Sequence, residues 1–113
     1  VIITVNLDEI IAHANNKDWE KVTLIFTEAA FKLQSLGADF IVIPCNSFHI
    51  VADDVQKAIS VPLLSIIDCV GDYISKLNYS KVALLGSNFT MENNFFINKL
   101  FNKYGVLAEV PDK

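Results

Sequence analysis

The sequence predicts an α/β fold: a parallel sheet with helices on both faces, built from alternating β-α-β units. Hydrophobic residues make up 52% of the 113 residues and charged residues only 19%, a balance typical of strands covered on both faces. Short apolar runs alternate with segments of helical spacing along the whole chain. Such alternation favours parallel strands joined by right-handed crossovers.

The N-terminal third is expected to contain a strand and two helices. Val1–Val5 is apolar and rich in β-branched residues, which favours a strand. Residues 8–14 place two isoleucines and an alanine on one side, as in a short helix. Asp18 is a typical N-cap for a longer helix at residues 19–36, whose apolar residues recur at helical spacing. Gly37 is expected to end that helix in the left-handed conformation.

The middle of the chain is expected to hold two buried strands. Residues 39–44 form an apolar run that breaks abruptly into Cys-Asn-Ser at residues 45–47. A helical pattern follows at residues 50–59. Leu63–Ile67 is then a second buried strand, which ends at Asp68.

The last third repeats this order of strand, polar turn and helix. Its two strands are rich in apolar residues, and the turn between the first of them and the next helix carries hydroxyl and amide side chains. The expected elements are a helix at 70–77, a strand at 81–85, a polar turn at 86–90, a helix at 91–104 ended by Gly105, and a strand at 106–110.

Composition excludes several classes of function. The net charge is −4 and the nine basic residues, all lysines, are scattered, so no nucleic-acid partner is expected. No apolar run approaches the roughly 20 residues that span a bilayer, so no membrane partner is expected. Cys45 and Cys69 lack further clustered ligands, which argues against a zinc site and a disulfide framework. Reduced thiols in a cytoplasmic protein are the expectation.

Cys45 is the first candidate for chemistry, because it lies where a strand feeds a helix. Ligands in α/β proteins sit beyond the carboxyl ends of strands, where helix N-termini favour anions and make thiols ionise more readily. This favours a cysteine that acts on a small carboxylate-bearing substrate. Two alternatives stay open: Cys45 as a small buried hydrophobic residue, and Asn46 and Ser47 as simple N-cap residues.

Four further residues have two readings each. His49 follows Cys45 by four residues, so it either forms a hydrolytic Cys–His pair or packs behind the site. Asp68 either brings a carboxylate to the same crevice or caps the next helix. Ser87 and Thr90 either form a small anion-binding turn or cap the helix after it, and capping does not exclude ligand binding.

One long motif resembles a known family. Residues 37–49 read Gly-Ala-Asp-Phe-Ile-Val-Ile-Pro-Cys-Asn-Ser-Phe-His, which looks like the first catalytic segment of aspartate/glutamate racemases, G-A-D-x-I-x-x-x-C-N-T-x-H. Ser47 stands where threonine is usual and keeps the hydroxyl. The similarity continues through residues 51–56, 61–68 and 81–91, and covers nearly the whole chain.

The resemblance implies a cofactor-independent amino-acid racemase with two similar α/β lobes. Residues 1–68 would be the remainder of the first lobe, with its catalytic cysteine, and residues 69–113 a crossover helix and the start of the second. In that family two cysteines flank the substrate α-carbon, and one thiolate removes the proton while the opposite thiol delivers another. Neither pyridoxal phosphate nor a metal takes part.

Motif position then implies roles for individual residues. Cys45 is the first-lobe catalytic cysteine, with Asn46 and Ser47 beside it as contacts of the substrate carboxylate. Ser87 and Thr90 match the second hydroxyl-rich turn and would contact the substrate from the other lobe. His49 and Asp68 would lie behind these residues. The implied substrate is a small dicarboxylic amino acid, aspartate or glutamate, and the longer family members imply a homodimer.

The chain departs from the family chiefly in completeness, because it resembles only the middle portion of a longer racemase. The family's second catalytic cysteine lies in a Gly-Cys-Thr segment that we expect to lie outside this chain, and Cys69 does not match it. We therefore expect that this chain alone does not racemise by the two-base route. Hydantoin racemase, maleate isomerase and arylmalonate decarboxylase have related cysteine sites, but the motif favours an amino-acid racemase. A cysteine hydrolase that uses Cys45 and His49 remains an alternative, as does a catalytically incomplete ligand-binding fragment.

Overall fold

The computed structural model describes residues 1–111, which divide into two compact units. Unit 1 comprises residues 1–43 and 51–64. Among the described residues, unit 2 comprises residues 44–50 and 65–111. The short segment 44–50, which carries Cys45, therefore packs with the C-terminal half of the chain rather than with the strand that precedes it.

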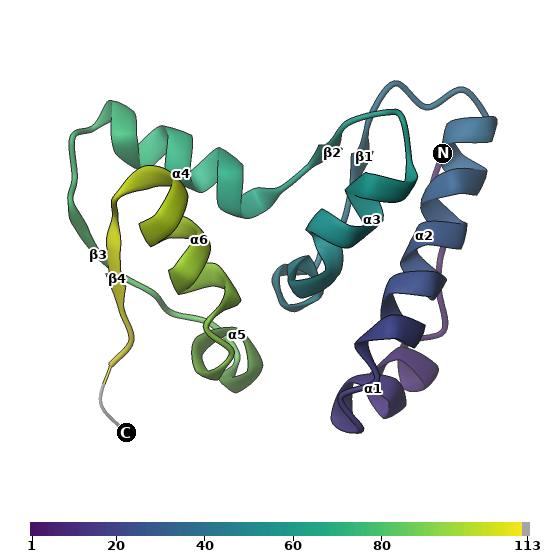
Figure 1. The fold of residues 1–113 in the computed structure, drawn as a ribbon, viewed down its shortest axis with the longest axis horizontal. Helices are drawn as coiled ribbons and strands as arrows, with labels where there is room; N and C mark the ends of the chain where they lie inside the picture. Colours follow the sequence, from purple (N-terminus) through teal and green to yellow (C-terminus); the bar gives the residue numbers. More distant parts are fainter. Residues whose placement is uncertain (112–113) are drawn as a thin grey trace. The chain divides into compact units, whose positions relative to one another are not determined.

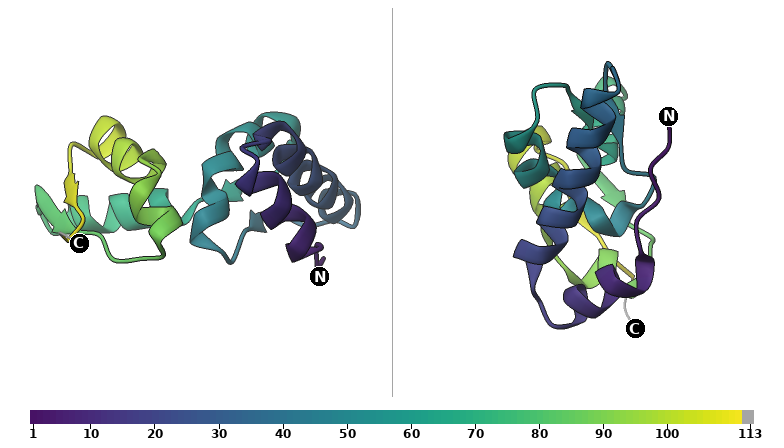
Figure 2. Two further views of the ribbon diagram at one scale, coloured as in Figure 1. Left: turned by 90° about the horizontal axis from the view of Figure 1, so that it is seen from below. Right: turned by 90° about the vertical axis from the view of Figure 1, so that its right-hand side faces the viewer.

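Unit 1 is a pair of short parallel strands with three helices. The strands β1 (Ile41–Val42) and β2 (Leu63–Leu64) pair in parallel, with Ile41 opposite Leu63. The central helix α2 contacts both of the other helices and β1 (Figures 1 and 2). The fully buried Ile10, Val22 and Val55 come one from each helix. The helices are α1 (Leu7–Asn15), α2 (Trp19–Ser35) and α3 (Ala52–Ala58).

Side-chain caps fix where the helices of unit 1 begin and end. The Asn6 side chain accepts hydrogen bonds from the backbone N–H groups of the first turn of α1. The Asp18 side chain accepts a hydrogen bond of 3.3 Å from Lys21 N–H at the start of α2. Gly37 follows α2 with φ of +86°, a conformation that favours glycine. The predicted roles of Asp18 and Gly37 are confirmed.

The predicted strand at Val1–Val5 is wrong, because these residues form no strand in the structure. Val1 and Ile2 are about nine-tenths exposed, at 91% and 89%. A strand needs a neighbour to complete its ladder of hydrogen bonds, and the described residues pair none with this segment. The strand predicted at residues 39–44 is likewise shorter than expected, since only Ile41 and Val42 are paired.

Unit 2 is also built around two parallel strands. β3 (Lys81–Ala83) pairs with β4 (Leu107–Glu109), and Val82 lies opposite Ala108. Helix α6 (Phe95–Tyr104) packs against both β4 and α4 (Ile66–Lys76), as Figure 1 shows. The core cluster consists of Ile67, Ile74, Phe96, Leu100, Val106 and Ala108.

Helix boundaries in unit 2 differ from the predicted ones. α4 begins at Ile66 instead of residue 70, so Asp68 neither ends a strand nor caps the helix but lies in its first turn. The helix predicted at residues 91–104 is two helices, α5 (Asn88–Glu92) and α6. Asn93 separates them with extended backbone, and its side chain donates a hydrogen bond of 2.9 Å to Phe89 C=O. Such side-chain bonds compete with helical ones.

The segment after Cys45 also differs from expectation. Residues 46–51 form a 3-10 helix, η1 (Asn46–Val51), and the α-helix α3 starts only at Ala52. Gly105 ends α6 in the left-handed conformation as predicted, with φ of +66°.

The predicted α/β class with parallel pairing is confirmed. The strands form two separate two-stranded sheets, β1–β2 and β3–β4. The predicted division into a first lobe that ends at residue 68 and a second lobe that starts at residue 69 refers to the longer, two-lobed racemase fold. It stays a prediction.

Candidate active site

Residues 44–50, which we call the Cys45 turn, follow β1, include the first five residues of η1 and belong to unit 2. The Cys45 side chain is exposed, so it is not the small buried hydrophobic residue of the alternative reading. Asn46 and Ser47 open η1. Because the turn packs with unit 2, these residues share one compact unit with Ser87 and Thr90.

The hydroxyl groups of Ser47, Ser87 and Thr90 converge into what we call the hydroxyl cluster. Ser47 Oγ lies 3.3 Å from Ser87 Oγ and 3.1 Å from Thr90 Oγ1. Ser87 Oγ lies 3.2 Å from Thr90 Oγ1, so the three oxygens form a closed triangle. Ser87 is exposed and Ser47 half-buried, whereas Thr90 is only 3% exposed.

Helix α5 holds two corners of this cluster in place. Ser87 is its N-cap residue, and Ser87 Oγ accepts a hydrogen bond of 3.3 Å from Thr90 N–H. Of the two alternatives for Ser87, the N-cap role is therefore confirmed, and the anion-binding role stays a prediction. The cap bond uses only a lone pair of Ser87 Oγ, so the hydroxyl proton of Ser87 can still be donated to another acceptor.

The hydroxyl cluster can serve as a set of donors for an anion. Each hydroxyl carries one proton that rotates about its C–O bond, and two lone pairs. Within the cluster these protons bond to neighbouring oxygens, but an approaching carboxylate accepts them more strongly than a neutral hydroxyl does. Three such donors gathered in one place suit a carboxylate group.

His49 is buried, at 5% exposed, and both of its ring nitrogens bond to backbone groups. Ile66 N–H donates to His49 Nε2 at 3.2 Å, so in the neutral ring this nitrogen carries the lone pair. The proton must then sit on Nδ1, which donates to Cys45 C=O at 3.0 Å. Neither nitrogen is left to act as a base toward the Cys45 thiol. The geometry therefore gives the Cys–His hydrolase no support.

The surroundings of His49 favour the neutral ring. Burial lowers the pKa of His49 below its ordinary value, and the positive charge of Lys99 lowers it further. Bonds to the backbone of Cys45 and Asn46 and the charge of Asp68 oppose this without reversing it.

Asp68 bonds to helix α6 rather than to the hydroxyl cluster. Its carboxylate accepts hydrogen bonds of 2.9 Å from Lys103 Nζ and from Tyr104 Oη, and lies 3.3 Å from Lys99 Nζ. Burial raises the pKa of Asp68, but these three partners outweigh it, so the pKa lies below its ordinary range. The lysines, spaced four residues apart on α6, were not singled out from the sequence, although that spacing places both on one helix face.

A pocket of about 510 Å³ adjoins the hydroxyl cluster within unit 2. Thr90 and Asn46 supply its polar lining, and the rest of the wall is apolar, from α4, the β3 segment and α6. Asn46, which directly follows Cys45 in the chain, thus lines the same pocket as Thr90. Cys69 is exposed in the first turn of α4 and does not line this pocket.

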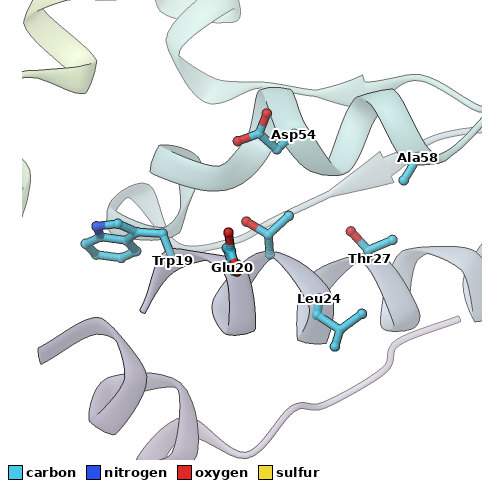
Figure 3. Close-up of a pocket in the computed structure, with 7 residues that line it drawn as sticks. Trp19, Glu20, Leu24, Thr27, Asp54 and Ala58 are labelled. Carbon is cyan, nitrogen blue, oxygen red and sulfur yellow. The ribbon is translucent and has the colours of Figure 1, made fainter. Parts of the chain in front are cut away.

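Unit 1 has a separate pocket of about 430 Å³ between α2 and α3 (Figure 3). Trp19 and Glu20 lie at one end and Ala58 at the other, with Thr27 and Asp54 between. None of the residues predicted to bind substrate lines it. Within residues 1–111 no three His, Cys, Asp or Glu side chains are grouped as metal ligands, and no helix of that part is long and apolar enough to cross a membrane.

Known proteins match this chain in sequence and in structure. It is 30% identical to the broad-specificity amino-acid racemase RacX of Bacillus subtilis (strain 168) over 81 residues, which is 70% of this chain and 34% of RacX. A candidate Asp/Glu racemase from Yersinia pestis superposes with a TM-score of 0.94 at 34% identity. An aspartate racemase homologue from Pyrococcus horikoshii OT3 superposes with a TM-score of 0.87 at 37% identity.

Both superpositions include the whole of this chain but only 49% of the other protein. The chain thus spans less than half the length of each of these relatives. The model of the Asp/Glu/hydantoin racemase family matches residues 2–113. The family resemblance of the motif around Cys45 is confirmed, and the chain belongs to the Asp/Glu/hydantoin racemase family.

Proposed function

We propose that the protein is an amino-acid racemase for a small dicarboxylic amino acid, aspartate or glutamate, with Cys45 as one of its two acid/base groups. One observation carries the proposal: the hydroxyl cluster of Ser47, Ser87 and Thr90 is assembled in the same unit as the exposed Cys45. A carboxylate bound there would be held next to the residues that follow Cys45 in the chain.

In the proposed reaction the hydroxyl cluster binds the α-carboxylate. The Cys45 thiolate removes the α-proton and becomes a thiol, while negative charge develops on the carboxylate. The hydroxyl donors stabilise that charge as it forms. A second acid then delivers a proton to the opposite face of the α-carbon, which inverts the configuration.

The second acid would come from the part of the relatives' length that these residues do not span. Cys69 receives no role, because it does not line the pocket beside the hydroxyl cluster. The route uses neither pyridoxal phosphate nor a metal. Membership of the family and the likeness to RacX, itself named as a racemase of broad specificity, support the reaction class.

Exchange of the α-proton with solvent tests the proposal directly. The chain would be incubated in D2O with L- and D-aspartate or L- and D-glutamate, and loss of the α-proton signal followed by NMR. We expect exchange that Cys45→Ala lowers by about 100-fold or more, as for loss of a general base. The matched variant Cys69→Ala, which removes the other exposed thiol, should exchange like the unmodified chain. Equal exchange by both variants would contradict the proposal.

A further inference from the structure

We propose that His49 is a positioning residue, which ties the Cys45 turn to the N-terminus of α4 and so sets where Cys45 and Ser47 stand in the site. This inference rests on the proposed racemase function. Both ring nitrogens of His49 bond to backbone groups, so neither is free to bond to the hydroxyl cluster or to the Cys45 thiol. His49 therefore acts on the site through the backbone of Cys45 and Ile66.

The two bonds of the ring join segments that lie apart in the chain. Nδ1–H donates to Cys45 C=O at 3.0 Å, and Nε2 accepts from Ile66 N–H at 3.2 Å. The first bond closes the turn on itself, and the second anchors it 17 residues further along. The imidazole therefore holds the turn and the helix at a fixed separation.

The start of α4 has no ordinary side-chain cap. Ser65 occupies the N-cap position of α4, but its side chain makes no capping bond. The Ser65 hydroxyl is buried and has no hydrogen-bond partner among the described residues. Ile66 is the first residue of α4, and its N–H, which an N-cap side chain does not usually reach, is satisfied by His49.

The turn is thereby fixed at three points. His49 holds the Cys45 carbonyl on one side and α4 on the other, while Ser47 Oγ lies 3.1 Å from the buried Thr90. Reacting groups must be held within about 0.5 Å for full activity, so a turn free to shift would lose contact with the cluster.

The clamp exists only while the ring is neutral, because a protonated Nε2 cannot accept from Ile66 N–H. The charged groups that act on the ring are Lys99 and Asp68, which oppose each other. The buried position, which disfavours the charged ring, keeps the acceptor available.

Two matched variants separate the two bonds. In His49→Asn the amide can still donate to Cys45 C=O, whereas in His49→Gln the longer side chain can still accept from Ile66 N–H. Both would be made with Cys69→Ala, so that Cys45 is the only thiol. The readouts are the rate at which iodoacetamide alkylates Cys45, protection of Cys45 by L-aspartate, and the urea midpoint.

A positioning role predicts that both variants are affected, because each breaks one of the two bonds of the clamp. Both should lose stability, and both should bind L-aspartate about fivefold more weakly, as for one lost hydrogen bond. Unchanged binding of L-aspartate in either variant would overturn the proposal.

Two measurements test the clamp independently of the racemase function. In the unsubstituted chain, long-range proton–nitrogen NMR should show the proton of His49 on Nδ1; a proton on Nε2 would overturn the proposal. Without ligand, the glutamine variant should alkylate at a rate different from that of its parent, even if L-aspartate gives no protection. If L-aspartate does not protect Cys45 in the parent but the glutamine variant still alkylates at a different rate, only the racemase function would be refuted.

Discussion

Ser47 shows how much one side chain contributes to the candidate site. Its hydroxyl lies within 3.3 Å of both Ser87 Oγ and Thr90 Oγ1, so it closes the hydroxyl cluster. Ser87 directly precedes α5 and Thr90 lies in its first turn, whereas Ser47 comes from the Cys45 turn. Removing it separates that turn from the cluster.

Replacing Ser47 should weaken substrate binding. Ser47→Ala removes one of three donors and should lower the affinity for L-aspartate about five- to tenfold, whereas Ser47→Thr keeps the hydroxyl and should bind like the unmodified chain. NMR titration measures both. Ser75→Ala, an exposed serine on α4, controls for unspecific effects. Wild-type affinity in Ser47→Ala would show that the cluster does not bind the carboxylate.

His49 should make stability depend on pH near neutrality. Its pKa in the folded protein lies below the ordinary value of about 6.5, so between the two values the unfolded chain binds more protons. The free energy of unfolding is therefore highest above about pH 6.5 and falls as the pH drops toward the folded-state pKa. Urea unfolding at a series of pH values measures this, and His49→Asn should flatten that part of the curve. An unchanged slope in the variant would contradict the assignment.

At the scale of elements, α4 and α6 pack closely because Gly71 has no side chain. A Cβ at Gly71 would overlap the ring of Tyr104 on α6. That ring is not free to move aside, since Tyr104 Oη donates to Asp68 on α4 at 2.9 Å. The glycine is thus needed for close approach and not for its backbone freedom.

Gly71→Ala should destabilise unit 2, although alanine is the better helix former. Overpacking of this kind lowers the free energy of unfolding by about 1–3 kcal/mol, which exceeds the gain in helix propensity of about 1 kcal/mol. Urea unfolding measures the difference. The control Ser75→Ala on the same helix is exposed and should be neutral or slightly stabilising. A Gly71→Ala chain as stable as the control would mean that the helices do not meet as described.

Asp68 links the same two helices through charge. Asp68→Asn keeps an acceptor for Tyr104 but removes the attraction to Lys99 and Lys103, and should lower the free energy of unfolding by about 1 kcal/mol, less at high salt. The matched control is Asp54→Asn, which breaks a pair with Lys57 that is exposed on both sides and should have little effect. Equal effects of the two substitutions would contradict a role for Asp68 in holding α4 to α6.

Element boundaries were predictable where a cap decides them and not where packing does. Asp18, Gly37 and Gly105 act as their chemistry predicts. Ile66 and Ile67, in contrast, were predicted as the end of a buried strand but begin α4, where Ile66 N–H donates to His49, a residue 17 positions earlier in the chain. An apolar pair at a boundary suits either element, and only tertiary contacts decide between them.

At the scale of the whole chain, the sequence pattern predicted that the candidate side chains lie at turns between strands and helices. It did not predict which of these turns lie beside one another. Ser47 and Ser87 are 40 residues apart, and they meet because residues 44–50 pack with unit 2. No local sequence pattern indicates that residues 44–50 pack with unit 2 rather than with the strand before them. The family motif supplied that information indirectly, by pairing the Cys45 turn with the turn before α5.

The central claim is that Cys45 transfers protons at one face of the substrate α-carbon. A single acid/base can reach the α-proton of only one enantiomer. We therefore expect this chain in D2O to exchange the α-proton of either L- or D-aspartate, but not both, with retained configuration and complete dependence on Cys45. Equal exchange of the two enantiomers, exchange that survives Cys45→Ala, or no exchange of either enantiomer would contradict the account.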